Sequence, residues 1–203
     1  MTSLRIETAS QTAGPYVHIG LVPARAGIEQ VQIVSHDLCP NPSPPGALVI
    51  EVSGHILDGS GSPIEDAVIE LWQADHHGQY AKSRTSDFRG WGRSAIDPES
   101  GRYRFRTIKP GAVPHRGSAF MAPHLAFWII ARGINLGLHT RMYFPEDAQA
   151  HHSDPVINTI EPKCRRSTLI ASSTDEATLD SVDKSYVFNI VIQGHDETVF
   201  FDI

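Results

Sequence analysis

Histidine is the residue type with the clearest chemical potential in this sequence, since eleven are present among 203 residues. Imidazole binds transition metals and exchanges protons near neutral pH. Two adjacent pairs, His76-His77 and His151-His152, lie in polar, turn-like stretches. We interpret both pairs as exposed loop residues, and a metal enzyme that uses them is a weaker alternative.

Two other histidines, His124 and His139, lie beside apolar, strand-like segments. A lone buried histidine usually bonds one ring nitrogen to the backbone. The sequence contains no H-x-H, H-E-x-x-H, G-x-S-x-G or G-x-G-x-x-G motif, so metal, nucleophilic and dinucleotide chemistry lack their usual signatures. By these criteria alone, the chain is a binding or structural β-domain.

Composition narrows the class of protein. Seventeen Lys and Arg against 23 Asp and Glu give a net charge of −6, which disfavours nucleic acid as a partner.

The longest apolar run, Leu125 to Ala131, is far shorter than the roughly 20 residues of a spanning helix, and the first residues lack the apolar core of a signal peptide. We expect a cytoplasmic protein without membrane contact, with Cys39 and Cys164 as buried free thiols.

Short β-like segments separated by Gly and Pro turns indicate the architecture. We predict strands over residues 48–57, 67–73, 101–107, 126–131, 139–144, 186–193 and 197–202. The first two flank an Asp-Gly-Ser-Gly-Ser-Pro turn and are predicted to form a hairpin. Arg102, Arg104 and Arg106 alternate with aromatic residues, which places the three arginines on one solvated or interface face. A β-sandwich follows from the many short strands.

Helix is scarce, and the best candidate covers residues 155–172, starting at Asp154-Pro155 and interrupted by Pro162. Residues 74–100 are expected to be irregular. Residues 1–45 contain a proline-rich stretch that favours extended chain. We interpret them as an N-terminal arm on the surface or on another subunit, and residues 46–203 as the β-sandwich of a single domain.

The segment from Gly54 to Asp75 closely resembles the signature of the intradiol ring-cleavage dioxygenases, and residues 10–16, 105–111 and 140–144 agree with further family segments in the same order. The resemblance spans most of the chain. It implies an all-β fold, a mixed β-sandwich with little helix. It also implies an enzyme family that opens catechols between their two hydroxyls, using ferric iron held by two tyrosines and two histidines.

Compared residue by residue, three of these four ligands are missing. His124 matches the first histidine, but Ala126 stands at the second. Val113 replaces one tyrosine, and residues 81–88 contain no tyrosine for the other. One imidazole without anionic phenolates does not hold ferric iron. We therefore expect no metal in this chain, with His124, Ala126 and Val113 as vestigial positions.

The missing ligands point to a branch of the family built from two homologous chains, an iron-bearing β chain and an iron-free α chain. Residues 10–20, 131–135, 139–141 and 193–202 resemble the α chain. The resemblance implies a large α/β hetero-oligomer with Fe(III) in the β chain. That complex cleaves 3,4-dihydroxybenzoate with O2 to 3-carboxy-cis,cis-muconate in the β-ketoadipate pathway. This chain alone is expected to be inactive; the alternative is a β-sandwich that binds small aromatics without a dioxygenase partner.

Selection of a carboxylated catechol requires a cation, and a guanidinium binds a carboxylate through two parallel hydrogen bonds. Arg132 ends the apolar strand and matches an arginine associated with substrate binding in the family; a salt bridge is the alternative role, and Arg141 is the second candidate. The loop residues Thr12, Gly14, Pro15 and Tyr16 are expected to wall the substrate, or else to form only the turn and interface packing of the arm.

Overall fold

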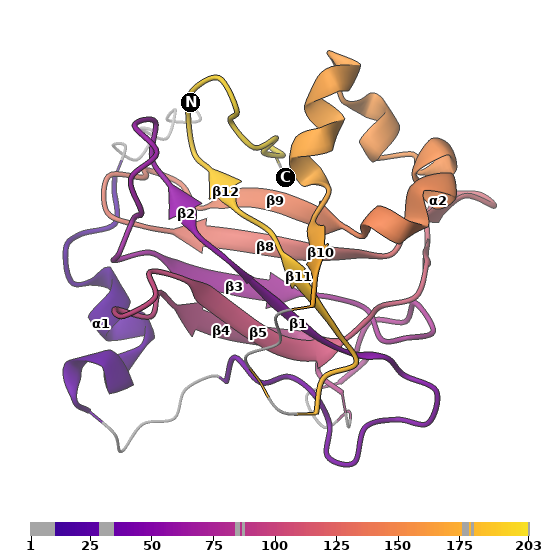
Figure 1. Ribbon diagram of the computed structural model, residues 1–203, viewed down its shortest axis with the longest axis horizontal. Coiled ribbons are helices and arrows are strands. Elements are labelled where there is room, and N and C mark those ends of the chain that lie inside the picture. The colour runs from indigo at the N-terminus through magenta and orange to yellow at the C-terminus, as the bar shows by residue number, and fades with distance from the viewer. Residues whose placement is uncertain are drawn as a thin grey trace, which may run out of the picture.

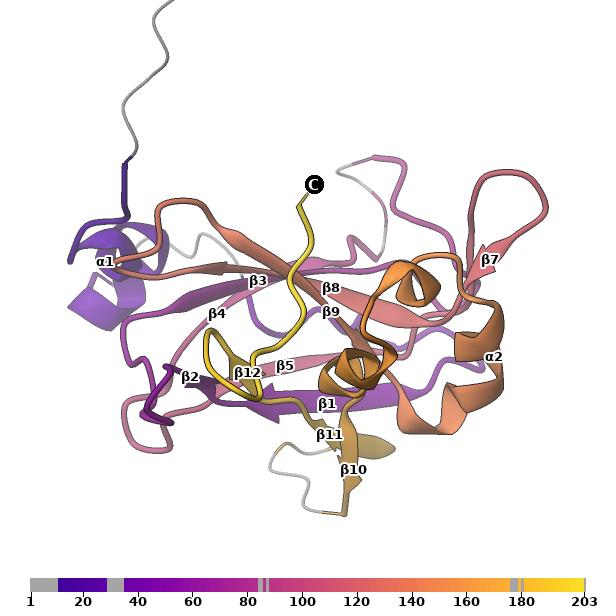
Figure 2. The same cartoon turned by 90° about the horizontal axis from the view of Figure 1, so that it is seen from above.

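Two four-stranded sheets lie face to face in the computed structural model, which describes residues 11–202 except 29–34, 84–85, 87, 176–178 and 180 (Figure 1; Figure 2). The first has the order β10 (Ser172–Thr174), β11 (Lys184–Val187), β1 (Val49–Gly54) and β5 (Tyr103–Ile108). The second has the order β4 (Trp91–Ala95), β3 (Val68–Trp72), β8 (His124–Ile130) and β9 (Leu138–Tyr143). Strands β1 and β11 are parallel and the other neighbours are antiparallel. This confirms the mixed β-sandwich.

Small elements complete the fold. Strand β2 (Ile56–Leu57) pairs with β12 (Ile190–Val191), and β6 (Val113–Pro114) pairs with β7 (Phe120–Met121). The α-helices α1 (Val17–Leu21) and α2 (Ala148–Ser153) are accompanied by 3-10 turns at Pro23–Ala26, Pro145–Asp147, Ile157–Thr159 and Lys163–Leu169. Within the described residues, no helix has the length and apolarity needed to cross a membrane.

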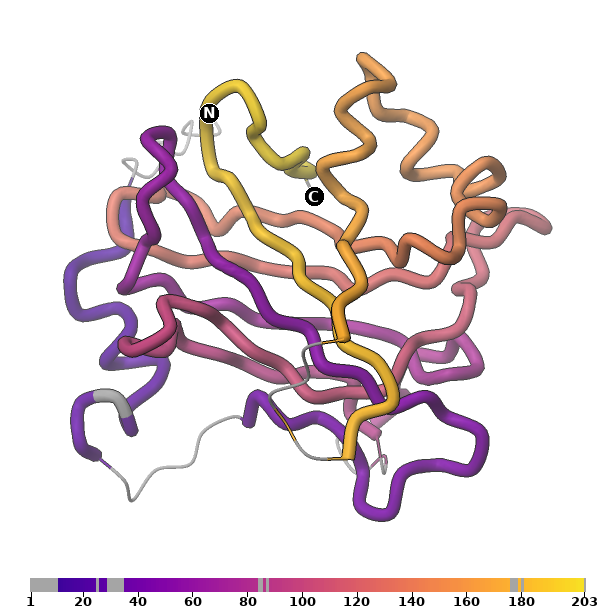
Figure 3. Tube along the Cα trace, viewed as in Figure 1, coloured from indigo at the N-terminus to yellow at the C-terminus, as the bar shows by residue number. Residues whose placement is uncertain are grey.

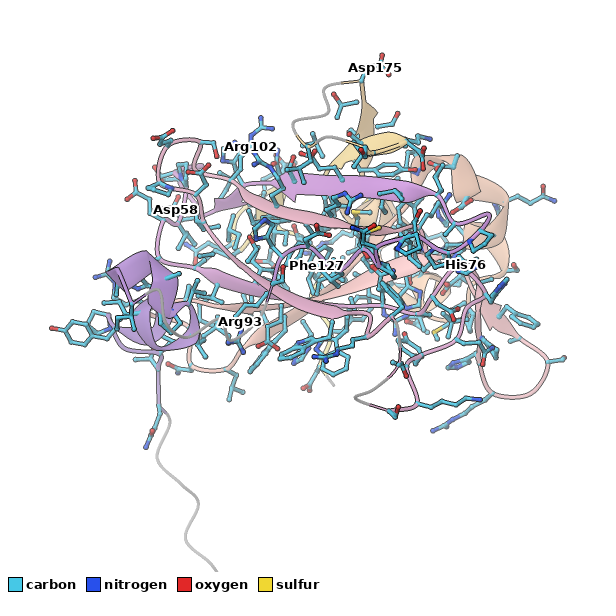
Figure 4. The ribbon with its side chains drawn as sticks, turned by 90° about the horizontal axis from the view of Figure 1, so that it is seen from below. Asp58, His76, Arg93, Arg102, Phe127 and Asp175 are labelled. Carbon is cyan, nitrogen blue, oxygen red and sulfur yellow. The ribbon has the colours of Figure 1, made fainter. Side chains whose placement is uncertain are left out.

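Alternation along the strands builds the core between the sheets. On β5, Tyr103 and Phe105 are fully buried, while Arg104 between them faces outward and pairs with Glu51 at 3.4 Å. Phe127 of β8 lies 5.9 Å from the ring of Tyr103 and in the interior between the layers (Figure 4). Large aromatic side chains contribute the most buried apolar area. The predicted face assignment of the Arg-Tyr-Arg-Phe-Arg segment is confirmed.

A buried amide ties one sheet to the other. The Gln73 Nε2 atom, just after β3, donates to the Ile108 carbonyl at 2.8 Å and to the Ala74 carbonyl at 3.0 Å. Thr107 Oγ1 donates to Gln73 Oε1 at 2.7 Å. Because a buried amide without partners costs free energy, these bonds hold the end of β3 against the end of β5.

The described part of the N-terminal segment packs on the edges of this chain's own sheets, and its course can be followed in Figure 3. The Arg93 amide of β4 donates to the Ser35 carbonyl at 3.1 Å, and the Leu38 amide donates to the Arg106 carbonyl of β5 at 2.8 Å. A Cβ on Gly92 would come within 2.5 Å of Leu38, so glycine makes room for this side chain. Residues 1–10 and 29–34 of the expected arm lie outside the described residues.

The predicted hairpin of residues 48–57 and 67–73 is wrong, because β1 and β3 belong to different sheets. The turn at Asp58 reverses the chain for a few residues, and the Ile64 amide donates to the Ile56 carbonyl at 2.8 Å. The chain then crosses to the second sheet, where it forms β3. The residues expected to be irregular contain β4, whose Trp-Gly-Arg-Ser-Ala sequence lacks an apolar pattern. These residues form a strand because they pair with β3, although their own strand propensity is low.

The predicted helix over residues 155–172 is also wrong. The Asp154 carboxylate accepts the amides of Val156 and Ile157 at 2.7 and 2.8 Å, which starts only a short 3-10 turn. Pro162 lacks an amide hydrogen and separates this turn from the next. Within the predicted strand at residues 197–202, only Phe201 forms a bridge, with His139. Both cysteines are free, but Cys39 is half-buried and Cys164 exposed, so burial was wrongly expected.

Candidate functional site

Strand β8 carries candidate residues at both ends. Its inner face presents Leu125, Phe127 and Ile129 to the core, so His124 and Ala126 point to the outer face of the second sheet. We call these two positions the histidine end. Arg132 follows the strand at the other end, beside the N-terminal segment, and we call that region the arm end.

At the histidine end, His124 is buried, with 2% of its surface exposed. Its Nδ1 atom lies 2.8 Å from the Ala122 carbonyl, which it satisfies as a donor in the neutral tautomer. Burial, followed by the charge of Arg141, lowers the pKa of His124 to about 4. The ring is therefore neutral at pH 7, as expected for a lone histidine bonded to the backbone.

Arg141 lies beside the vestigial positions. It is the cross-strand partner of Ala126 in β9, so the guanidinium and the alanine methyl share the outer face. Its Nη1 atom is 3.3 Å from Met121 Sδ. Met121 packs in turn with Val113, one of the positions predicted to be vestigial, in a small apolar cluster. The side chains gathered here are therefore a permanent cation and two apolar groups, none of which is an anionic metal ligand.

Two tyrosines approach the histidine end without offering phenolates. Tyr143 is the cross-strand partner of His124, with ring centroids 5.8 Å apart. Burial raises the pKa of Tyr143 to about 12 and also raises that of Tyr80. Both are neutral phenols at pH 7. A single imidazole that is bonded to the backbone, with a guanidinium beside it, does not fit a ferric ion.

The paired histidines do not complete a ligand set. The rings of His76 and His77 contact each other, with centroids 3.9 Å apart. His151 approaches the edge of Tyr143 at 5.5 Å. Each pair combines a half-buried and an exposed ring, so the expectation of full exposure is wrong for His76 and His151. In the described part of the chain, no three His, Cys, Asp or Glu side chains gather around a metal position.

At the arm end, residues distant in sequence meet. Ala13 forms a parallel bridge with Arg132, and the Thr12 hydroxyl donates to the Ile134 carbonyl at 3.3 Å. Gly133 has φ +87°, a conformation that favours glycine and lets the chain turn directly after Arg132. The structure thus brings Arg132 next to the loop that contains the other predicted substrate-binding residues.

The loop itself is open to solvent. Thr12, Gly14, Pro15 and Tyr16 are all exposed, and 75% of the Tyr16 surface is accessible. The Gly14 carbonyl accepts the Val17 amide at 3.1 Å, so the loop turns directly into α1. The Leu21 carbonyl at the end of α1 accepts Arg93 Nη1 at 2.9 Å, which anchors the helix to β4. Tyr16 is therefore an exposed aromatic side chain on a loop of fixed position, which is suited to contact a second molecule.

Arg132 projects from this end with 65% of its side chain exposed. Its Nε atom lies 3.3 Å from Asp66 Oδ2, which is the salt bridge considered as its alternative role. Asp66 was not singled out from the sequence, because a carboxylate in a turn carries no signal of its eventual partner. Arg141, the second candidate for the carboxylate, lies instead at the histidine end.

Comparison with known proteins gives consistent matches. The family described as Dioxygenase matches residues 23–194. The chain is similar to the protocatechuate 3,4-dioxygenase alpha chain of Pseudomonas putida, at 42% identity over 97% of this chain and 96% of the relative. It is also similar to the protocatechuate 3,4-dioxygenase beta chain of Burkholderia cepacia, at 34% identity over 85% of this chain and 77% of the relative. The structure of 3-chlorocatechol 1,2-dioxygenase from Rhodococcus opacus 1CP shares the fold, with a TM-score of 0.60 and 24% identity over 76% of this chain and 63% of that one.

Proposed function

Since this chain belongs to the intradiol ring-cleavage dioxygenase family, we propose that it is the iron-free α subunit of a protocatechuate 3,4-dioxygenase. The observation that carries the proposal is the pairing of Ala126 with Arg141 at the position where the family's second histidine is expected. The chain's strong similarity to an α chain, and its weaker similarity to a β chain, support the same assignment.

In this proposal, the β chain holds the iron, which supplies the redox chemistry of cleaving 3,4-dihydroxybenzoate with O2 to 3-carboxy-cis,cis-muconate. The α chain contributes no catalytic residue. Its arm end is placed against the partner's site, where Thr12, Gly14, Pro15 and Tyr16 exclude water and limit how the substrate ring lies. The exposure of this loop and its attachment beside Arg132 support the placement.

Arg132 binds the substrate carboxylate in this proposal. A guanidinium offers two parallel donors to a carboxylate, which suits the group that distinguishes 3,4-dihydroxybenzoate from catechol. Asp66 forms an ion pair with Arg132 at 3.3 Å from Nε and helps to orient the side chain. The backbone bridge to Ala13 fixes the position of Arg132 relative to the loop.

Co-expression with a β chain tests the assignment. The isolated α chain is expected to be colourless and inactive, and the purified complex to contain iron, show the red-brown colour of a ferric phenolate and consume O2 with 3,4-dihydroxybenzoate. Stoichiometric iron and ring cleavage by the isolated chain would contradict the proposal. Failure to associate with any β chain, together with tight binding of small aromatics, would favour the independent binding protein.

A further inference from the structure

The guanidinium of Arg141 lies among neutral groups. Its Nη1 atom is 3.3 Å from Met121 Sδ, and its Cζ atom is 5.6 Å from the centroid of the Phe201 ring. In the described part of the chain, Arg141 forms no ion pair with a carboxylate within 4.0 Å. No carboxylate of the described residues therefore pairs directly with this positive charge.

Asp154 is a fully buried carboxylate near the histidine end, and both of its oxygens accept backbone amides. Its Oδ2 atom accepts the Ala122 amide at 2.6 Å, and its Oδ1 atom accepts the amides of Val156 and Ile157. It therefore holds the loop around α2 rather than offering a ligand to a cation. The neighbouring His124 ring is bonded to the Ala122 carbonyl and not to an anion.

An arginine cannot lose its proton in a protein, so its charge persists at every relevant pH. Ala126 lies between Arg141 of β9 and Trp72 of β3, so its small side chain has the guanidinium on one side and an indole on the other. A metal ion coordinated by His124 and a side chain at position 126 would lie beside this cation. Repulsion between like charges is strong where water is partly excluded.

We propose that Arg141 excludes cations from the histidine end, so that this chain is kept free of metal by charge as well as by missing ligands. The inference rests on the proposed iron-free function and adds a residue that enforces it. It implies that restoring the lost ligands alone does not restore metal binding. Arg141 acts here through its charge and position and does not touch the substrate.

The test restores two ligands and varies the charge. Val113→Tyr with Ala126→His adds a phenol and an imidazole to the existing His124. This double variant is compared with the same protein carrying Arg141→Gln or Arg141→Lys. Arg102→Gln, directly before β5, makes the same change in net charge as Arg141→Gln and is the matched control. Zn²⁺ affinity is measured by titration calorimetry, since Zn²⁺ accepts nitrogen and oxygen ligands and has no redox chemistry.

Arg141→Gln is expected to tighten Zn²⁺ binding by the double variant at least tenfold, while Arg141→Lys and Arg102→Gln leave it weak. With ferric citrate, only the protein with Arg141→Gln is expected to develop visible ferric-tyrosinate absorption. Equal affinity with and without Arg141→Gln overturns the inference, and so does the absence of binding in both. If circular dichroism shows that Val113→Tyr prevents folding, Ala126→His with and without Arg141→Gln provides the same comparison for Zn²⁺.

The native chain separates this inference from the proposed function. If the native chain binds iron stoichiometrically, the proposal that it is an iron-free subunit is wrong. Suppose instead that the native chain binds no iron, and that the double variant binds Zn²⁺ equally tightly with and without Arg141→Gln. The proposed iron-free function then stands, and the proposed role of Arg141 is wrong.

Discussion

His124 and Arg132 lie at opposite ends of one strand: β8 starts at His124, and Arg132 follows its last residue, Ile130, after Ala131. At about 3.3 Å per residue, an extended chain of this length separates their backbones by roughly 25 Å. They therefore cannot serve a single small-molecule site within this chain. The histidine end and the proposed substrate wall can be changed independently by mutation.

Replacement of Arg132 tests the carboxylate role. A lost hydrogen bond to a charged group typically costs about 1.5–3 kcal/mol, so Arg132→Ala in the assembled enzyme is expected to raise KM for 3,4-dihydroxybenzoate about tenfold or more. Catechol, which lacks the carboxylate, should be affected little. Steady-state O2 consumption with both substrates measures the difference. Equal losses for the two substrates would reject the role.

Asp66 provides the control for this measurement. Asp66→Asn removes the charge that contacts Arg132 Nε but leaves the guanidinium in place. Because exposed ion pairs contribute about 0–1 kcal/mol, the stability of the chain should change little. We expect a rise in KM for 3,4-dihydroxybenzoate that is smaller than that of Arg132→Ala. An unchanged KM in both variants would mean that Arg132 serves only the salt bridge.

Tyr16 tests the wall formed by the exposed loop. With 75% of its surface accessible, Tyr16→Ala is expected to change the free energy of unfolding of the isolated chain by less than about 0.5 kcal/mol. In the assembled enzyme the same change should weaken substrate binding or association with the β chain, because an aromatic contact is lost only there. Urea unfolding of the chain and KM of the complex are compared. A large loss of stability in the isolated chain would assign Tyr16 to internal packing instead.

His124 makes stability depend on pH. Its pKa is about 4 in the folded chain and about 6.5 when unfolded, so between these values the unfolded state binds more protons. Stability is therefore full above pH 6.5 and falls as the pH drops toward 4, by about 2 kcal/mol between pH 7 and pH 5. Urea unfolding of the native chain and of His124→Gln at both pH values measures this. A similar fall in both proteins would show that other groups dominate.

Glu146 is expected to stabilise the fold against acid. Burial alone would raise its pKa, but hydrogen bonds from Tyr186 at 2.5 Å, Lys109 at 2.9 Å and Lys184 at 3.1 Å outweigh burial and lower the pKa to about 2. The stabilisation is present above the unfolded pKa near 4.5 and is lost as the pH falls toward 2.

Glu146→Gln should lower the free energy of unfolding at pH 7 by roughly 1–3 kcal/mol. The loss of stability from pH 5 to pH 3 should also be smaller than in the native chain. A double-mutant cycle with Tyr186→Phe isolates the hydroxyl contact. No interaction energy in that cycle, measured by urea unfolding at pH 7, would contradict a stabilising role for this hydrogen bond.

The local pattern of apolar and polar residues predicted most of the strands. Residue types at single positions showed which metal-binding side chains the chain lacks. Period-two alternation placed Tyr103 and Phe105 in the core and the arginines outside, because a strand turns successive side chains to opposite faces. Residue identity alone established that Ala126 and Val113 cannot ligate a metal. The helix predicted over residues 155–172 failed because Asp154 binds nearby amides and supports only a 3-10 turn.

Only the tertiary structure decided which residues meet. The pairing of β8 with β9 placed Arg141 beside Ala126, the bridge from Ala13 brought the loop to Arg132, and Asp66 became the partner of that arginine. None of these contacts has a local signal, because strand order and register depend on how two whole sheets bury their apolar faces together. The sequence alone determined which residue types stand at positions 113, 124 and 126, and the fold determined what lies beside them.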